Sequence, residues 1–373
     1  MFEKLNEYLE HLDVPSCDIL IRKDHKVLFR SMYGHSDYEK KVPLTGNETY
    51  CMYSCSKTLT SCAVMQLIER GLLSPDDPVY SYLPAYKELK VLENGVLRPA
   101  RTTLTIRHLL SMQSGMNYGL NSPEILAENK KHNGQATTRQ LVDAMALTPL
   151  SFDPGTDFLY SLSHDVLAAV VEVISGMRFS EYLKQNIFEP VGMRHTGFSF
   201  TDEIHALQCA QYRDDPDRGQ FVPIEREHLE YRLSPEYESG GAGIISCTED
   251  MAAFADAIAS GSTEKGCSLL QPETINLWRT PQLCAKGKAS FDLWKRFGYS
   301  YAMGVRTRVD TSIGRGGPKG EFGWDGAAAS YIMMDPENHL SFFMAMHVRS
   351  FGKAYNVIHP TVQTLIYDEL SGR

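Results

Sequence analysis

The stretch Tyr53-Ser54-Cys55-Ser56-Lys57-Thr58 opens a strongly apolar segment that continues to Ile68. Residues 59–68 leave almost no polar face, which is typical of a helix buried on nearly all sides. Gly71 then ends the segment. Because residues three apart on a helix share a face, with about 5 to 6 Å between them, the spacing predicts that Lys57 can reach the hydroxyl of Ser54.

This Ser/Lys pair could form a nucleophile and its base. A serine hydroxyl is a poor nucleophile until a neighbouring group takes its proton. Lys57 can take it only if burial lowers its pKa from about 10.4, and a buried helix start supplies that burial. The alternative for Ser54 is a helix N-cap with Lys57 exposed to solvent. The same spacing recurs at Ser262 and Ser350, neither of which opens an apolar helix.

Composition places the chain among ordinary globular proteins. Its 373 residues can bury a sizeable core, and they are 43% hydrophobic and 22% charged. The formal net charge of -9, without any Lys/Arg cluster, argues against nucleic acid or an anionic membrane as the main partner. No apolar run reaches the roughly 18 residues of a membrane span, so no membrane segment is expected.

The spacing of the cysteines and histidines indicates the cellular compartment and whether a metal site is expected. The N-terminal residues lack the apolar core of a signal peptide, and the eight Cys include no C-x-x-C pair. A reduced, cytoplasmic setting fits this pattern best. The twelve His show no metal-ligand spacing, so we expect neither a metal nor a cofactor.

The order of the predicted elements indicates an α+β fold. Strands are predicted near both ends of the chain, over 17–21, 27–33, 299–305, 331–334 and 340–347. Helices are predicted over 2–12, 105–110, 138–147, 166–174, 179–188, 248–259, 272–278 and 355–370, besides the helix after Ser54. We expect one unit over 1–373, in which an antiparallel sheet draws on about 1–57 and 240–373. Helices flank this sheet, and a mostly helical insertion covers about 58–239.

Several enzyme classes lose their usual sequence support. The chain contains no G-x-S-x-G elbow, no H-E-x-x-H, no P-loop and no G-x-G-x-x-G. An α/β-hydrolase, a zinc protease of that type and a nucleotide-dependent enzyme are therefore disfavoured.

Three short motifs resemble those of the serine β-lactamase and penicillin-binding protein superfamily, in order and separation. They are Ser54-Cys55-Ser56-Lys57-Thr58, Tyr160-Ser161-Leu162 and Trp324-Asp325-Gly326. The stretches 104–115 and 240–246 also resemble its class C β-lactamase-like branch, which includes family VIII carboxylesterases, D-alanyl-D-alanine peptidases and acyltransferases of the lovastatin-synthase type. The resemblance extends over most of the chain and implies a β-lactamase/transpeptidase-like fold.

The resemblance implies a role for each motif residue. Ser54 would be the acylated nucleophile, Lys57 its proton acceptor or electrostatic partner, and Tyr160 the second general base and acid. The backbone N–H groups of Ser54 and Ala327 would form the oxyanion hole.

The strand motif would line the cleft. Trp324 would close the edge of the sheet as well as face the substrate, and Gly326 would let the substrate approach the strand backbone. Related β-lactamases carry a cationic or His residue and a Thr where this chain has Trp324 and Asp325. We expect the Asp325 charge to repel a substrate carboxylate.

Two further positions concern substrate contacts. The tyrosine motif of β-lactamases ends in Asn, which holds an acylamide, whereas Leu162 offers no hydrogen bond. His347 ends a predicted strand near the cleft and is a candidate for contact with substrate, while His164 is expected to be exposed on a first helical turn.

These observations favour a serine hydrolase, an esterase or acyltransferase acting on small ester or acyl substrates through an acyl-enzyme on Ser54. One alternative is a β-lactamase or D-amino-acid peptidase, which Leu162 and Asp325 disfavour. The other alternative is a non-catalytic binder of acyl ligands, which the complete set of Ser54, Lys57 and Tyr160 disfavours.

Overall fold

A seven-stranded antiparallel sheet forms the centre of the molecule, in the strand order β2-β1-β13-β12-β11-β10-β9. The computed structural model describes residues 2–199, 202–225 and 231–372. The sheet joins the two ends of the chain, since Asp18 in β1 lies opposite Ala345 in β13. Its strands are β1 (Ser16–Lys23), β2 (Lys26–Gly34), β9 (Tyr299–Tyr301), β10 (Arg306–Arg308), β11 (Phe322–Asp325), β12 (Tyr331–Asp335) and β13 (Leu340–Ala345).

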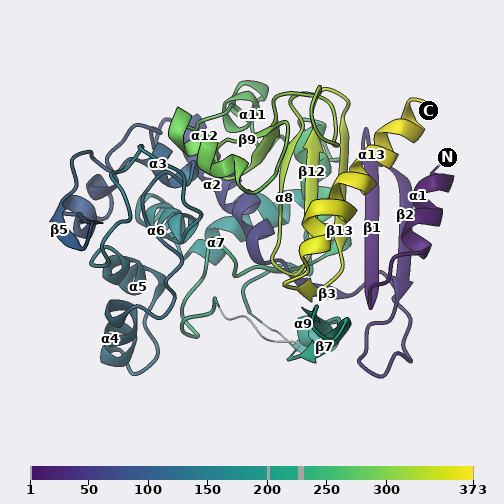
Figure 1. Cartoon of the computed structure of the whole chain (residues 1–373), viewed down its shortest axis with the longest axis horizontal. Coiled ribbons are helices and arrows are strands. Elements are labelled where there is room, and N and C mark those ends of the chain that lie inside the picture. The colour runs from purple at the N-terminus through teal and green to yellow at the C-terminus, as the bar shows by residue number, and fades with distance from the viewer. Residues whose placement is uncertain (1, 200–201, 226–230, 373) are drawn as a thin grey trace.

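Both faces of this sheet are buried, and alternate side chains point to opposite layers. On one face, Ile19, Ile21 and Met333 pack with the terminal helices α1 (Glu3–Glu10) and α13 (His359–Leu370). Figure 1 shows these two helices side by side at the end of the molecule where N and C lie, and the Leu5 N–H donates to Glu369. The chain ends therefore cover the outer face together.

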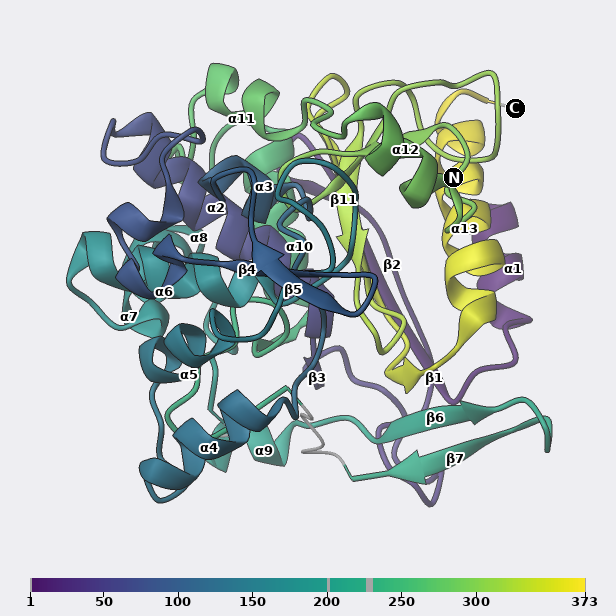
Figure 2. The same cartoon turned by 60° about the vertical axis from the view of Figure 1, so that its left-hand side comes forward.

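The opposite face of the sheet packs on helices. Leu20, Ile332 and Phe343 join the larger core, which includes α10 (Thr248–Ala259) and α2 (Ser56–Glu69). Twelve of the fourteen residues of α2 are buried, as the apolar segment after Thr58 predicts. In Figures 1 and 2, α2 lies between the sheet and a group of helices that forms the far side of the molecule.

Those helices come from the middle of the chain. They are α3 (Ile106–Leu110), α4 (Pro123–Lys131), α5 (Thr138–Met145), α6 (Ser163–Ser175) and α7 (Phe179–Leu183). Four more helices lie elsewhere among the described residues, α8 (Glu189–Val191), α9 (Asp202–Ala206), α11 (Pro272–Trp278) and α12 (Ala285–Asp292). Among the described residues, none of the helices has the length and apolarity that crossing a bilayer requires.

Three small sheets complete the fold. They are the hairpin of β4 (Lys90–Glu93) and β5 (Val96–Pro99), the pair β3 (Thr49–Cys51) and β8 (Ile245–Cys247), and a sheet of β6 (Gln211–Asp215), β7 (Gln220–Ile224) and β14 (Val348–Arg349). The predicted α+β class and the antiparallel sheet built from both chain ends are confirmed. The hairpins β4-β5 and β6-β7 and the helices α4 and α12 were not predicted, because short polar segments carry little periodicity.

Candidate active site

Ser54 lies on a single 3-10 turn, Tyr53–Cys55, between β3 and α2. The preceding residue, Tyr53, has a φ of 46°, a left-handed conformation that is uncommon outside glycine. Its hydroxyl donates to Gln211 Oε1 at 2.7 Å, and the Met52 N–H donates to Ile244 O at 2.9 Å. These contacts on both sides of the turn hold Ser54 at the mouth of α2.

Lys57 is fully buried below Ser54. Its ammonium nitrogen lies 3.2 Å from Ser54 Oγ, 3.0 Å from the Tyr118 hydroxyl and 2.7 Å from the carbonyl oxygen of Gly241. Burial lowers the pKa of Lys57 to about 7, while the negative charge of Asp165 raises it. The prediction that Lys57 reaches Ser54 is confirmed, and the alternative of an exposed Lys57 is wrong.

Asp165 supplies a buried carboxylate near this lysine. Its Oδ1 accepts hydrogen bonds from Tyr237 at 2.8 Å and Ser239 at 2.5 Å. Gly241 passes so close that an added Cβ would lie 2.6 Å from Asp165 Oδ2 and 3.4 Å from Lys57 Nζ. The lysine is therefore enclosed by backbone and polar side chains, with no room for a larger residue at 241.

Tyr160 lies on the loop before α6, as predicted. Its ring is 4.7 Å from Lys57 Nζ, and its hydroxyl accepts a hydrogen bond from Trp324 Nε1 at 2.8 Å. Burial raises the pKa of Tyr160, although the Ser54 and Trp324 hydrogen bonds lower it in part. At neutral pH the phenol therefore keeps its proton in the free protein, which suits it to donate a proton and leaves Lys57 as the group able to accept one.

A second tyrosine, Tyr118, also contacts the pair and was missed by the sequence analysis. Its hydroxyl accepts the hydrogen bond from Lys57, and its ring stacks on Tyr160 with the centroids 5.7 Å apart. Tyr118 lies on a loop three residues after Gly115, where no periodic pattern marks it. Only the resemblance of the stretch 104–115 to related proteins pointed to this neighbourhood.

A cavity of about 440 Å³ opens above Ser54. It is lined by Ser54, Tyr160, Trp294, Arg296, Trp324, Asp325, Gly326, Ala327, Tyr355 and Asn356. Ser54 and Ala327, the two residues predicted to form the oxyanion hole, both line it. Four of these ten residues are aromatic and come from four separate segments of the chain, which suits an apolar acyl or alcohol group.

Asp325 does not present a free negative charge to this cavity, contrary to the expectation from sequence. Its Oδ2 accepts from Arg296 at 2.6 Å, and its Oδ1 lies 2.9 Å from His359 Nδ1. Burial alone would raise the pKa of Asp325, but Arg296, His359 and Arg306 hold it well below the usual range. The carboxylate is ionised and neutralised locally, so repulsion of a substrate carboxylate is not supported.

Position 326 requires glycine for a reason other than the predicted approach of substrate. A Cβ at this position would lie 2.4 Å from Met52 O and 2.1 Å from Ser330 Oγ, which are inside the protein. The glycine therefore lets the end of β11 pack against the turn that carries Ser54. Its backbone still lines the cavity.

Three other predicted positions lie away from the cavity wall. Leu162 is buried in the large core next to the helices. His347 is buried, receives a hydrogen bond from the Cys51 N–H at 3.2 Å and lies 3.2 Å from Ala210 O, so it fastens β3. His164 is fully buried with Nε2 3.1 Å from Ser61 Oγ, so the prediction that it is exposed is wrong.

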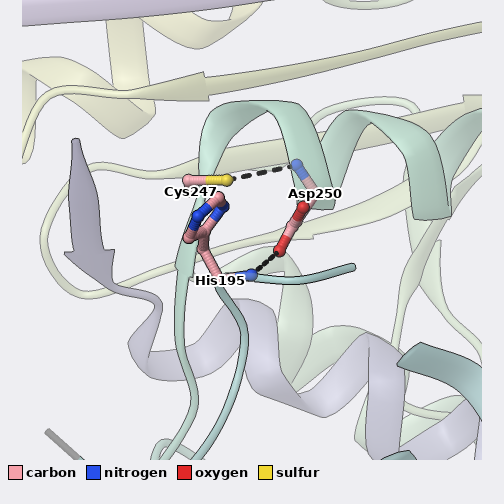
Figure 3. A group of neighbouring side chains, drawn as sticks. All are labelled: His195, Cys247 and Asp250. Carbon is pink, nitrogen blue, oxygen red and sulfur yellow. Dashed lines mark hydrogen bonds between the residues drawn. The ribbon is translucent and has the colours of Figure 1, made fainter. Parts of the chain in front are cut away.

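One group of possible metal ligands lies elsewhere, comprising His195, Cys247 and Asp250, whose ligand atoms are within 4.8 Å of one another (Figure 3). Asp250 Oδ2 already accepts from the His195 N–H at 2.7 Å and from Thr196 Oγ1 at 2.8 Å. Cys247 Sγ accepts from the Asp250 N–H as the cap of α10, and burial raises its thiol pKa to about 12. These hydrogen bonds explain why the three residues lie together, since they cap the start of α10. We therefore assign no metal to this group.

The fold and the buried Ser/Lys pair together define a serine enzyme of the β-lactamase/transpeptidase-like class. The sequence matches the Beta-lactamase family over residues 3–359, and the chain belongs to that family.

Similar proteins include an acyltransferase and an esterase. The chain is 28% identical to acyltransferase calJ of Penicillium decumbens over 357 residues, which cover 87% of this chain and 80% of that protein. It is 29% identical to esterase EstB of Burkholderia gladioli over 257 residues, which cover 64% of each. The structure is similar to unliganded simvastatin synthase LovD from Aspergillus terreus, with a TM-score of 0.81 and 22% identity over 98% of this chain and 96% of that one.

The charge state of Lys57 should set the pH dependence of ester turnover. Because only the neutral amine accepts a proton, kcat/KM should rise with pH through about 7. In Asp165→Asn, loss of the negative charge lowers the pKa of Lys57 further, so the rise of kcat/KM with pH should occur at lower pH. Asp256→Asn, a buried carboxylate remote from Lys57, serves as the control. If the rise of kcat/KM occurred at the same pH in Asp165→Asn as in the wild type, a group other than Lys57 would be the one that titrates.

Tyr118→Phe should lower kcat about 10- to 100-fold, since it removes a hydrogen bond to Lys57 worth about 1.5 to 3 kcal/mol. The matched control is Tyr86→Phe, which removes a buried hydrogen bond to Val142 O far from the cavity. Steady-state kinetics and thermal unfolding should be measured for both. Equal kcat for the two variants would assign Tyr118 a purely structural role.

Proposed function

We propose that this protein is a serine hydrolase or acyltransferase that takes small ester substrates through an acyl-enzyme on Ser54. The observation that carries the proposal is the buried Lys57 amine, 3.2 Å from Ser54 Oγ at the base of an apolar cavity. Burial brings the pKa of Lys57 to about 7, so a large fraction of the amine can accept a proton at neutral pH. The names of the similar proteins, an acyltransferase and an esterase, support the same chemistry.

Acylation follows from this geometry. Neutral Lys57 takes the Ser54 proton as Oγ forms a bond to the ester carbonyl carbon, and the carbonyl oxygen gains a negative charge. The N–H groups of Ser54 and Ala327 stabilise that oxygen. Tyr160 gives its proton to the leaving alcohol oxygen as the C–O bond breaks, and the proton on Lys57 then restores Tyr160.

Deacylation uses water or an alcohol as the attacking group. Neutral Lys57 accepts the proton of the attacking hydroxyl as its oxygen bonds to the acyl carbon, and returns that proton to Ser54 Oγ as the C–O bond to the serine breaks. Water yields a carboxylic acid, whereas an alcohol yields a new ester. The aromatic wall of Trp294, Trp324 and Tyr355 favours apolar groups on either side of the reacting carbon.

The β-lactamase or peptidase alternative finds less support. Leu162 is buried in the core, so the tyrosine motif offers no amide to hold an acylamide, and the Trp324 indole N–H is already bonded to Tyr160. A non-catalytic binder would have no need of a lysine whose pKa burial brings to about 7.

We also propose a reducing, cytoplasmic compartment. All eight cysteines are free thiols and six of them are buried, where they pack as small apolar side chains.

A fluorophosphonate probe should modify Ser54 alone. Intact-mass analysis should show one adduct, mapped by peptide digestion to the segment containing Ser54, and Ser54→Ala should lose the adduct and nearly all turnover while unfolding at a similar temperature. The matched controls are Ser262→Ala and Ser350→Ala, which should label as the wild type does. Labelling at either of those serines instead would refute the assignment.

Esters should be better substrates than β-lactams. We expect p-nitrophenyl butyrate to exceed a chromogenic cephalosporin in kcat/KM by about 100-fold, equivalent to about 2.7 kcal/mol of transition-state discrimination. Side-by-side initial rates on one enzyme preparation make this comparison. Comparable efficiencies would favour the β-lactamase alternative.

A further inference from the structure

A second, smaller cavity of about 140 Å³ adjoins the catalytic one. The two share a wall made of Arg296, Tyr355 and Asn356. A ligand that extends from Ser54 past this wall would therefore reach the second cavity. It has about a third of the volume of the catalytic cavity, so it suits a functional group better than a whole substrate.

Four cations line this second cavity, namely Lys295, Arg296, Arg306 and Arg315. Arg296 is paired with Asp325. Lys295 and Arg315 are exposed at its mouth, and within the described part of the chain neither has a carboxylate within 4.0 Å. The positive charge at the mouth is thus available to a ligand, in a protein whose net charge is -9.

Arg306 forms the floor of this cavity and is 1% exposed. Its guanidinium carbon lies 4.5 Å from the Tyr331 ring and 5.4 Å from the Tyr299 ring, and Nη2 donates to the Tyr331 hydroxyl at 2.5 Å. Its Nη1 has no hydrogen-bond partner among the described residues. Buried polar groups are normally paired, so the solvent-shielded Nη1 of this lining residue lacks one acceptor.

Within the protein interior, the carboxylate of Glu321 interacts electrostatically with Arg306. It is fully buried, next to the side chains of Tyr299 and Gln363. Burial raises the pKa of Glu321 and Arg306 lowers it. Glu321 and Asp325 can offset at most two of the four cations, which leaves the cavity positive.

We propose that this cavity is an anion subsite, which holds a carboxylate, phosphate or sulfate group of the acyl substrate while the ester lies over Ser54. The inference rests on the proposed function and adds a substrate class, namely esters that carry an anionic group beyond the scissile bond. Phe297 lines the subsite and Trp294 lines the catalytic cavity, and both are substantially exposed. Their rings would cover the apolar part of such a substrate between its two ends.

Matched pairs of esters test the proposal. Mono-p-nitrophenyl glutarate places the anion on the acyl group, and 4-(butyryloxy)benzoate places it on the leaving alcohol; p-nitrophenyl butyrate and methyl 4-(butyryloxy)benzoate are the neutral partners. At least one anionic ester should exceed its neutral partner about tenfold in kcat/KM, which corresponds to about 1.4 kcal/mol. The advantage should shrink as salt is raised from 10 mM to 0.5 M, because exposed charges are screened.

Variants locate the effect. The double variant Lys295→Gln/Arg315→Gln should lower the ratio of anionic to neutral turnover toward one, whereas Arg218→Gln, an exposed cation on the β6-β7 turn, should leave that ratio unchanged. An equal fall for both esters, or a neutral preference in the wild type, would overturn the proposal. Arg306→Lys keeps the charge on the floor and should retain part of the preference, and thermal unfolding shows whether this buried variant folds.

A binding measurement separates this inference from the esterase proposal. Calorimetry on Ser54→Ala with glutarate, benzoate and inorganic phosphate requires no turnover, and at least one anion should bind and lose affinity in the charge variant. Failure of every anion to bind would refute the subsite even if esters are hydrolysed. Binding of free phosphate without any advantage for the anionic esters would refute the link to substrate.

Discussion

The burial of the Lys57 amine is the constraint on which the site depends. A lysine inside a protein is costly unless its charge is lost or compensated, and here burial brings the pKa to about 7. Three oxygens, from Ser54, Tyr118 and Gly241, lie within hydrogen-bond distance of Nζ, and Asp165 moderates the loss of charge. The nearly all-buried α2 and the tight glycine loop at 240–241 make sense as the enclosure that this one amine requires.

A second constraint joins the helix to the sheet. Gly326 at the end of β11 has no space for a side chain because Met52 and Ser330 fill it, so the turn of Ser54 and the cavity wall are built against each other. Asp325 next to it is tied to Arg296 and to His359 of α13. The wall opposite the nucleophile is therefore held by a segment before β9 and by the last helix, both far away in sequence.

Sequence patterns were informative where the physics is local. The apolar run after Thr58 predicted a buried helix, the spacing of Ser54 and Lys57 predicted their contact, and strands near both ends predicted the shared sheet. Contacts between distant segments leave no such pattern. The pairing of Asp325 with Arg296 neutralises the charge that was expected to repel a carboxylate. Tyr118 reaches Lys57 from an aperiodic loop, and His347 holds β3 in place instead of contacting a ligand.

The pairing of β1 with β13 also bears on how the protein is made. Asp18 and Ala345 lie opposite each other, so the sheet cannot close until almost the whole chain has been synthesised. At about 5 to 20 residues per second, the hairpin of β1 and β2 waits on the order of tens of seconds with its inner edge unpaired. During that interval the open strand edge is exposed to pairing with other chains. Ser54 itself lies near the start of the chain, but residues 294–356 supply most of its cavity wall, so the site is also completed only when the last elements have been made.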